Sequence, residues 1–126
     1  ERSLTEIIEE LQAQIMDVFF DYDKYAIKGE FKAKLEANAE LLMANEEINL
    51  VIEGHCDERG TAEYNLALGA RRANAVREYL MSRGLPAGRL KTVSYGKERP
   101  IEVCSVEACY AKNRRAVTVL AGGLTS

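Results

Sequence analysis

Five consecutive side chains that can take part in chemistry follow an apolar segment of the chain. Residues 55–59 are His-Cys-Asp-Glu-Arg, and they come directly after residues 48–54, INLVIEG. Such a group could bind a metal, supply a thiol nucleophile with its base, or bind a charged ligand. A zinc site would combine the first two with Cys104 and Cys109, because thiolates and imidazole are ligands that zinc prefers. Adjacent side chains on extended backbone point to opposite faces, and no two cysteines have C-x2-C spacing, so the sequence disfavours a metal site.

The two enzymatic hypotheses also lack support in the spacing. A cysteine nucleophile needs a base within hydrogen-bond distance, and the only histidine is His55, whose side chain diverges from that of Cys56. Glycoside hydrolysis needs two carboxyl groups about 5 to 9 Å apart. The candidate carboxylates are Asp21, Asp23, Asp57 and Glu58, and the sequence alone does not place two of them at that distance. Hydrolysis therefore stays a weaker alternative.

A charged residue on the apolar face of a predicted helix favours ligand binding instead. Residues 63–83 have a helical pattern in which Leu68, Val76 and Leu80 share one face. Arg72 lies on that face, and a guanidinium there must find an anion or lose several kcal/mol to desolvation. This position needs an explanation.

Asp57 is an anion that Arg72 could meet. It precedes the helix in the loop, and Asn65 lies on the same helix face near the helix start. On spacing alone, an internal Asp57–Arg72 ion pair and a ligand site are equally good interpretations.

The elements that must position these residues alternate along the chain. We expect strands at 16–21, 48–54, 90–96 and 114–120, helices at 30–45 and 63–83, and a loop with one helical turn at 97–113. The nearly continuous apolar run at 48–54 predicts an interior strand buried on both faces. Asn45 can end the first of these helices in the left-handed conformation. The order predicts an α+β protein: a β-α-β-α-β-β sandwich with a mixed four-stranded sheet and helices packed against it.

A leader precedes this pattern. Ser3 and Glu6 have capping-box spacing, and Leu4, Ile8, Leu11 and Ile15 form a narrow apolar stripe, which predicts a spacer helix. We divide the chain into a helical leader (1–15), one binding domain (16–121) and a C-terminal tail (122–126).

Charge and cysteine content limit the environment. A net charge of -3 gives no general attraction for phosphates, so we expect no nucleic-acid partner. The chain begins at Glu1 and not at methionine, which suggests a processed or excised piece whose membrane anchor could have been lost. Four residues separate Cys104 from Cys109, which permits a disulfide and leaves Cys56 over. A disulfide would indicate an oxidising compartment.

Four segments of the chain resemble one known family. They are FFDYDKYAI, EGHCDERGTAEYNLALGARRANAVREYL, VSYGKERP and AKNRRAVTV, which follow in family order and extend over nearly all of residues 16–120. Together they are similar to the OmpA-like peptidoglycan-binding domain, and DERGTAEYN with YGKE is most similar to the branch of the peptidoglycan-associated lipoproteins (Pal). The resemblance implies a domain that is not an enzyme and needs no cofactor or metal. Cys56 and the Cys104–Cys109 pair depart from the family pattern.

The resemblance also implies a ligand, the meso-diaminopimelate residue of the peptidoglycan stem peptide. Asp57 would hold the ammonium group of its side chain and Arg72 the carboxylate, which suits one anion and one forked cation. The matching positions add five pocket residues: Asp23, Tyr22, Arg59, Asn65 and Leu68. Asp23 could instead be a turn residue, Asn65 a helix cap and Leu68 plain core. Arg114 and Arg115 match the family's NRR, and one of them could reach Asp57.

The expected function is a noncovalent tether between the outer membrane and the cell wall in the periplasm of a Gram-negative bacterium. The membrane would be reached only through an anchor that this segment lacks. The periplasmic propeller protein of the Tol system is a possible partner by resemblance. The alternatives are a module that mainly docks Tol or other proteins and, more weakly, a cell-wall hydrolase.

Overall fold

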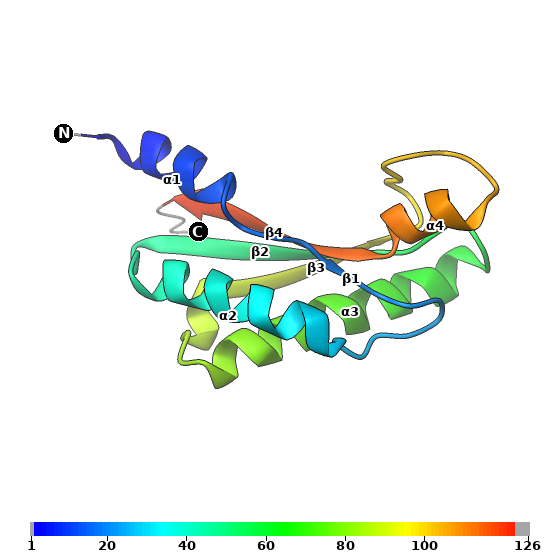
Figure 1. Cartoon of the computed structure of the whole chain (residues 1–126), viewed down its shortest axis with the longest axis horizontal. Helices are drawn as coiled ribbons and strands as arrows, with labels where there is room; N and C mark the ends of the chain where they lie inside the picture. The colour runs from blue at the N-terminus through cyan, green and yellow to red at the C-terminus, as the bar shows by residue number, and fades with distance from the viewer. Residues whose placement is uncertain (1, 123–126) are drawn as a thin grey trace.

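The computed structural model describes residues 2–122 and has the predicted α+β class. Its elements are α1 (Leu4–Gln12), β1 (Val18–Phe19), α2 (Gly29–Met43), β2 (Ile48–His55), α3 (Ala62–Ser82), the 3-10 turn η1 (Ala87–Arg89), β3 (Leu90–Gly96), α4 (Glu107–Asn113) and β4 (Arg115–Gly122). The sheet order is β1-β4-β2-β3, with β2 parallel to β3 and antiparallel to β4. Helices α2 and α3 lie together on one side of this mixed sheet (Figure 1). No helix within residues 2–122 is long and apolar enough to cross a membrane.

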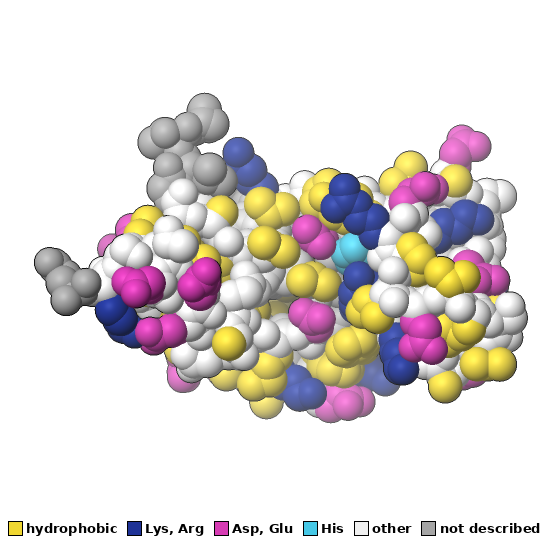
Figure 2. Space-filling view, turned by 90° about the horizontal axis from the view of Figure 1, so that it is seen from above, with side chains coloured by type: hydrophobic (Ala, Val, Ile, Leu, Met, Phe, Trp, Pro, Cys, Tyr) yellow, Lys and Arg dark blue, Asp and Glu magenta, His cyan; other side chains and the backbone are white. Residues whose placement is uncertain are grey.

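The core lies between the sheet and these two helices. Ile48, Leu50 and Ile52 of β2 are at most 1% exposed, and they pack with Leu35 of α2 and Leu80 of α3. The alternate residues of β2 are only half-buried, so the expectation of burial on both faces was wrong. The two large helices cover one face of the sheet, and the opposite face carries charged side chains of both signs around the single histidine (Figure 2).

The leader helix α1 packs against the sheet. Its predicted capping box is present, with the backbone N–H of Glu6 donating to Ser3 Oγ and that of Ser3 to the Glu6 carboxylate. The amide of Gln12 then donates to Thr118 O at 2.9 Å and accepts from Leu120 N at 2.8 Å. This side chain bonds the edge of β4 as a neighbouring strand would. The boundary at residue 16 stays a prediction, and the tail beyond Gly122 lies outside the described residues.

Three segments differ from the expectations. The first strand has only two paired residues, because the chain turns away at Asp21 into a loop where Asp23 has a φ of 56°. Helix α2 ends at Met43, and Asn45 does not take the left-handed conformation; its side-chain amide donates to Leu41 O instead. The single helical turn expected in the loop is the seven-residue helix α4.

Two glycines set the distance between β2 and α3. A Cβ atom at Gly54 would collide with the backbone carbonyl of Gly69, and one at Gly69 would collide with Ser94 Oγ. The backbones of β2 and α3 therefore touch directly at this crossing, which no side chain other than hydrogen permits. The crossing brings the residues after β2 close to the first turns of α3.

Candidate ligand-binding site

A small pocket of about 50 Å³ lies where the carboxyl end of β2, the start of α3 and the loop after β1 meet. The seven residues expected in the site, apart from the Arg114–Arg115 pair, all line this pocket, although they come from three separate segments. The lining residues are Tyr22, Asp23, Cys56, Asp57, Arg59, Gly60, Tyr64, Asn65, Leu68 and Arg72. Eight of these ten residues come from the loop 56–60 and from α3, which the Gly54–Gly69 crossing holds close together.

Asp57 is a buried carboxylate with every acceptor position in use. It is 4% exposed. Its Oδ1 accepts from the backbone N and the Nε of Arg59 at 3.0 and 3.2 Å, and its Oδ2 accepts from Arg59 Nη2 at 2.7 Å and Arg114 Nη1 at 3.4 Å. Burial alone would raise its pKa, but the hydrogen bonds and charge of Arg59, with a contribution from Arg114, outweigh it and lower the pKa. Asp57 is therefore an anion at neutral pH.

Arg59 is held between two aromatic rings. Its guanidinium carbon lies 3.9 Å from the ring centre of Tyr22 and 4.3 Å from that of Tyr110. Cation–π stacking on two faces keeps the fork aligned with the Asp57 carboxylate while leaving one third of the side chain exposed. Arg59 therefore closes one side of the pocket.

Arg114 and Arg115 point to different sides, as consecutive residues at the start of a strand must. Arg114 reaches the site, because its guanidinium contacts Asp57. It also donates to Phe20 O at 2.8 Å and to Glu107 Oε2 at 2.8 Å. Arg115 lies on the other side of the sheet and donates to Asn113 O and Arg99 O. Of the two arginines, Arg114 is the one that contacts Asp57.

Arg72 does not pair with Asp57; the described ion pairs of Asp57 are with Arg59 and Arg114, so the internal Asp57–Arg72 bridge was wrong. The Arg72 side chain is 0% exposed and donates to three carbonyl oxygens, those of Lys24, His55 and Asp21, at 2.8 to 3.1 Å. These bonds tie the loop after β1 to the end of β2. A guanidinium has five N–H donors, so two remain beyond these three bonds. Burial lowers the pKa of Arg72 below the ordinary value of an arginine side chain.

The remaining expected residues form the rim and floor. Asp23 sits in a turn and accepts a hydrogen bond from the Tyr64 hydroxyl, so it is both a turn residue and part of the rim. Asn65 is 3% exposed and donates to Arg59 O at 2.8 Å, while Thr61 is the residue that caps α3. Leu68 is buried but lies outside the main core cluster, on the pocket floor.

His55 and Cys56 diverge, as the spacing predicts. Cys56 is 3% exposed, and burial raises the pKa of its thiol to about 11, which keeps it protonated. The His55 ring lies on the other side, 3.2 Å from Glu53 Oε1, and its Nδ1 is buried without a hydrogen-bond partner among residues 2–122. Neither arrangement supplies a nucleophile with a base.

Sequence reasoning missed three residues of the site. Tyr64 contacts Asp23, Tyr110 stacks on Arg59, and Glu107 bonds Arg114. Tyr64 could have been found as a neighbour of Asn65 in the first turn of the helix. Tyr110 and Glu107 carry no such signal, because both sit in a segment interpreted as loop; Tyr110 is about fifty residues from Arg59, and Glu107 is seven residues from Arg114.

The fold and this pocket define a class. The OmpA family model matches residues 19–114, and the chain belongs to the OmpA family. Among its relatives, the peptidoglycan-associated lipoprotein of Rhizobium meliloti (strain 1021) is 54% identical over 105 residues, which are 83% of this chain and 60% of that protein. The lipoprotein of the same name from Pasteurella multocida (strain Pm70) is 50% identical over 110 residues, covering 87% of this chain and 73% of that protein. The chain thus spans about 60% of the Rhizobium relative.

Solved structures agree with this assignment. The crystal structure of the peptidoglycan-associated lipoprotein from Burkholderia pseudomallei has a TM-score of 0.81 and 42% identity, covering 83% of this chain and 89% of that one. The C-terminal domain of Helicobacter pylori MotB reaches a TM-score of 0.80 at 22% identity, covering 86% of each chain. The second likeness shows the fold alone.

Proposed function

We propose that this chain binds peptidoglycan noncovalently through the meso-diaminopimelate of its stem peptide and so tethers the outer membrane to the cell wall. The observation that carries the proposal is one small pocket lined by a buried carboxylate, Asp57, and a buried guanidinium, Arg72. The free end of diaminopimelate bears an ammonium and a carboxylate on one carbon, which these two charges match. The names of the relatives, peptidoglycan-associated lipoprotein, support peptidoglycan as the binding partner.

The ligand-free geometry adds a condition to this binding. Because Arg59 and Arg114 already fill the acceptor positions of Asp57, an incoming ammonium group must exchange with one of these guanidinium contacts. The Arg114 contact, at 3.4 Å, is the longest of the four and is the one we expect to yield to the ammonium group, while Arg59 keeps its forked contact. The two remaining donors of Arg72 would then bind the ligand carboxylate.

The proposed location follows from the function. We place a chain with this ligand in the periplasm of a Gram-negative bacterium, next to the outer membrane. The domain acts by binding and not by catalysis.

Calorimetry with a diaminopimelate-containing stem peptide tests the pocket. Asp57→Asn removes the anion at nearly constant volume, and Glu58→Gln is the matched control, because Glu58 is an exposed carboxylate one position away. We expect Asp57→Asn to weaken binding about 30- to 1000-fold, the roughly 2 to 4 kcal/mol that truncating one side of a desolvated charge pair costs. Glu58→Gln should bind like the unchanged protein. If Asp57→Asn bound the stem peptide as tightly as Glu58→Gln does, the proposed site at Asp57 would be rejected.

The ligand side of the same experiment tests specificity. A stem peptide with lysine in place of diaminopimelate lacks the second carboxylate and should bind at least about tenfold more weakly. Equal affinity for the two peptides would remove Arg72 from the proposed contacts.

Protein docking is the second candidate function, and an exposed apolar segment supports it. Ile101, Val103 and Val106 are 58%, 80% and 61% exposed in the loop before α4. Such a cluster is typical of an interaction surface, and the Tol propeller protein is the partner we would test. Retention on purified sacculi without any protein partner separates wall binding from docking, and release of soluble muropeptides would instead indicate hydrolysis.

A further inference from the structure

Helix α4 contacts both arginines that pair with Asp57. Tyr110 stacks on the guanidinium of Arg59 at 4.3 Å. Glu107, one turn earlier, accepts from Arg114 at 2.8 Å and lies 3.7 Å from Arg59 Nη2. The two arginines that pair with Asp57 are therefore themselves contacted by one aromatic ring and one carboxylate from a single short helix, although neither of these two residues lines the pocket.

This helix cannot hold its position by itself. It has seven residues, and Val106 at its N-cap offers no side-chain hydrogen bond. Isolated helices of this length are unstable in water, because the free-energy cost of forming the first turn exceeds what the few hydrogen bonds of two turns contribute. Among the described residues of α4, only Cys109 and Asn113 are buried.

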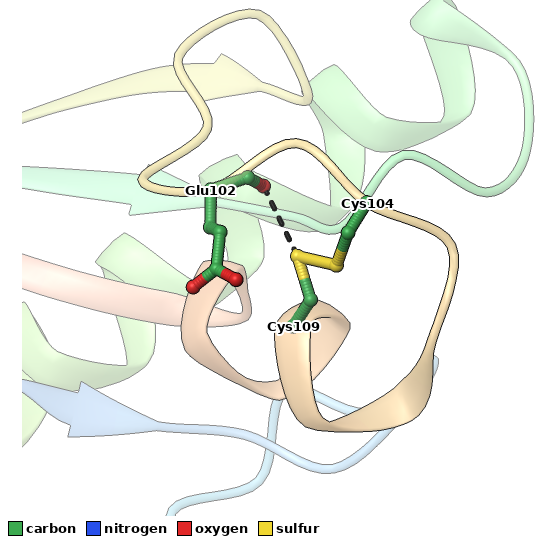
Figure 3. A group of neighbouring side chains, drawn as sticks. All are labelled: Glu102, Cys104 and Cys109. Atoms are coloured by element: carbon green, nitrogen blue, oxygen red, sulfur yellow. Dashed lines mark hydrogen bonds between the residues drawn. A yellow bond between two sulfur atoms is a disulfide. The ribbon is translucent and has the colours of Figure 1, made fainter.

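Contacts with the preceding loop hold both ends of α4. At the C-terminal end, Asn113 accepts from Ile101 N at 2.6 Å and donates to Glu102 O at 2.9 Å. At the other end, the structure joins Cys109 to Cys104 by a disulfide (Figure 3). The Sγ atom of Cys109 lies 3.3 Å from Glu102 O, a contact without a donated proton, because a bridged sulfur carries none. The first turn of α4, which carries Glu107 and Tyr110, is thus fixed by the disulfide.

We infer that the Cys104–Cys109 disulfide positions the ligand-binding charges, by holding α4 where Tyr110 and Glu107 align the arginines on Asp57. This inference rests on the proposed function of the pocket. Without the bridge, the first turn of α4 is free to move, and ligand binding must order Tyr110 and Glu107 again. Ordering these two side chains again on binding should weaken the binding by about tenfold.

A positioning role differs from general stabilisation in its pH dependence. The charged and titratable groups around Asp57 are Arg59 on its own loop, Arg114 before β4, Glu107 on α4, and Arg72 and Cys56 beside the pocket. Burial raises the pKa of Asp57, and the aligned arginines lower it below the ordinary value. When α4 loosens and the arginines lose their alignment, they lower the pKa of Asp57 less, while burial still raises it. The pKa of Asp57 therefore rises. The acid midpoint at which ligand binding is lost should therefore move to higher pH.

The experiment compares the unchanged protein with Cys104→Ser/Cys109→Ser. Binding of the diaminopimelate stem peptide is measured by calorimetry from pH 7 down to the acid limit of the folded protein. The double variant should bind about tenfold more weakly at pH 7, and its acid midpoint should lie higher. Ser105→Ala, an exposed change inside the same loop that keeps the disulfide, is the matched control and should match the unchanged protein on both measures.

A second variant covers the case in which the double variant does not fold. Tyr110→Ala keeps the disulfide and removes the ring that stacks on Arg59, so it should show the same direction of change in both measures.

The possible outcomes separate the two hypotheses. No binding by the unchanged protein rejects the proposed function, and this inference with it. If the unchanged protein binds and the variants match it in affinity and acid midpoint, the inference alone is overturned. Weaker binding with an unmoved acid midpoint also overturns it, because that result assigns the disulfide to fold stability only.

Discussion

At the scale of single residues, two buried charges of opposite sign, Asp57 and Arg72, line the pocket. The apolar stripe of the helix singled out Arg72, and the loop order singled out Asp57; both line the pocket. Their bonding partners depend on the main-chain path after β1, which spacing does not encode. Arg72 bonds three carbonyls that include those of Lys24 and Asp21, about fifty residues away.

A fold-stability prediction follows from these bonds. Arg72→Ala leaves three carbonyl oxygens without their donor and opens a cavity in the buried interior, so we expect a loss of about 3 to 5 kcal/mol in the free energy of unfolding. Denaturant titration measures it. Arg71→Ala changes the exposed neighbouring arginine and is the control; a comparable loss there would contradict the structural role of Arg72.

The buried histidine predicts a pH effect on stability. Burial and the charge of Arg115 lower the pKa of His55 below its ordinary 6.5, although the Glu53 contact opposes them. The folded state therefore binds this proton less readily than the unfolded chain does. Stability is full above about pH 6.5 and falls as the pH drops toward the folded pKa, by at most about 1.4 kcal/mol per pH unit.

The test compares unfolding free energies at pH 7 and pH 5.5 in the unchanged protein and in His55→Gln, which has no proton to gain. The variant should lose less stability between the two pH values. An identical loss in both proteins would show that other groups cause the change.

At the scale of elements, periodicity located the long helices and the three long strands within a few residues. Periodicity failed for β1 and α4, whose lengths depend on contacts with other parts of the chain. The segment around β1 is rich in β-formers, but only Val18 and Phe19 find partners in β4. Helix α4 was underestimated because it is held by contacts with the preceding loop, the Cys109–Cys104 disulfide and the hydrogen bond from Asn113 to Glu102 O.

The β2–α3 crossing gives a prediction at this scale. Gly54→Ala places a methyl group against the Gly69 carbonyl and must push α3 away from the sheet. Forced expansion of a well-packed contact costs about 1 to 3 kcal/mol or more, and because α3 carries Asn65 and Arg72, peptide binding should weaken as well. Thermal unfolding and calorimetry measure the two effects. Gly88→Ala, which meets nothing within 4 Å, should change neither.

At the scale of the whole molecule, the leader helix lies at one end of the long axis. The segments whose residues line the pocket, which are the end of β2, the start of α3 and the loop after β1, lie at the other end (Figure 1). Deleting residues 1–12 removes Leu11 from the core and the Gln12 bonds from β4, so we expect about 2 to 4 kcal/mol less stability. Affinity for the stem peptide should stay within about twofold, since no pocket residue is touched. A large loss of affinity in a folded truncated chain would show that α1 takes part in the site.

This arrangement has a mechanical consequence. A pulling force applied between these two ends runs nearly parallel to β2 and β4, which lie along the long axis (Figure 1). These two strands are paired antiparallel from Ile48 opposite Gly122 to Gly54 opposite Ala116. Such a load shears the ladder, so its hydrogen bonds must yield together and not one after another. The β2–β4 ladder therefore meets tension along the long axis in shear, the direction in which its hydrogen bonds act together.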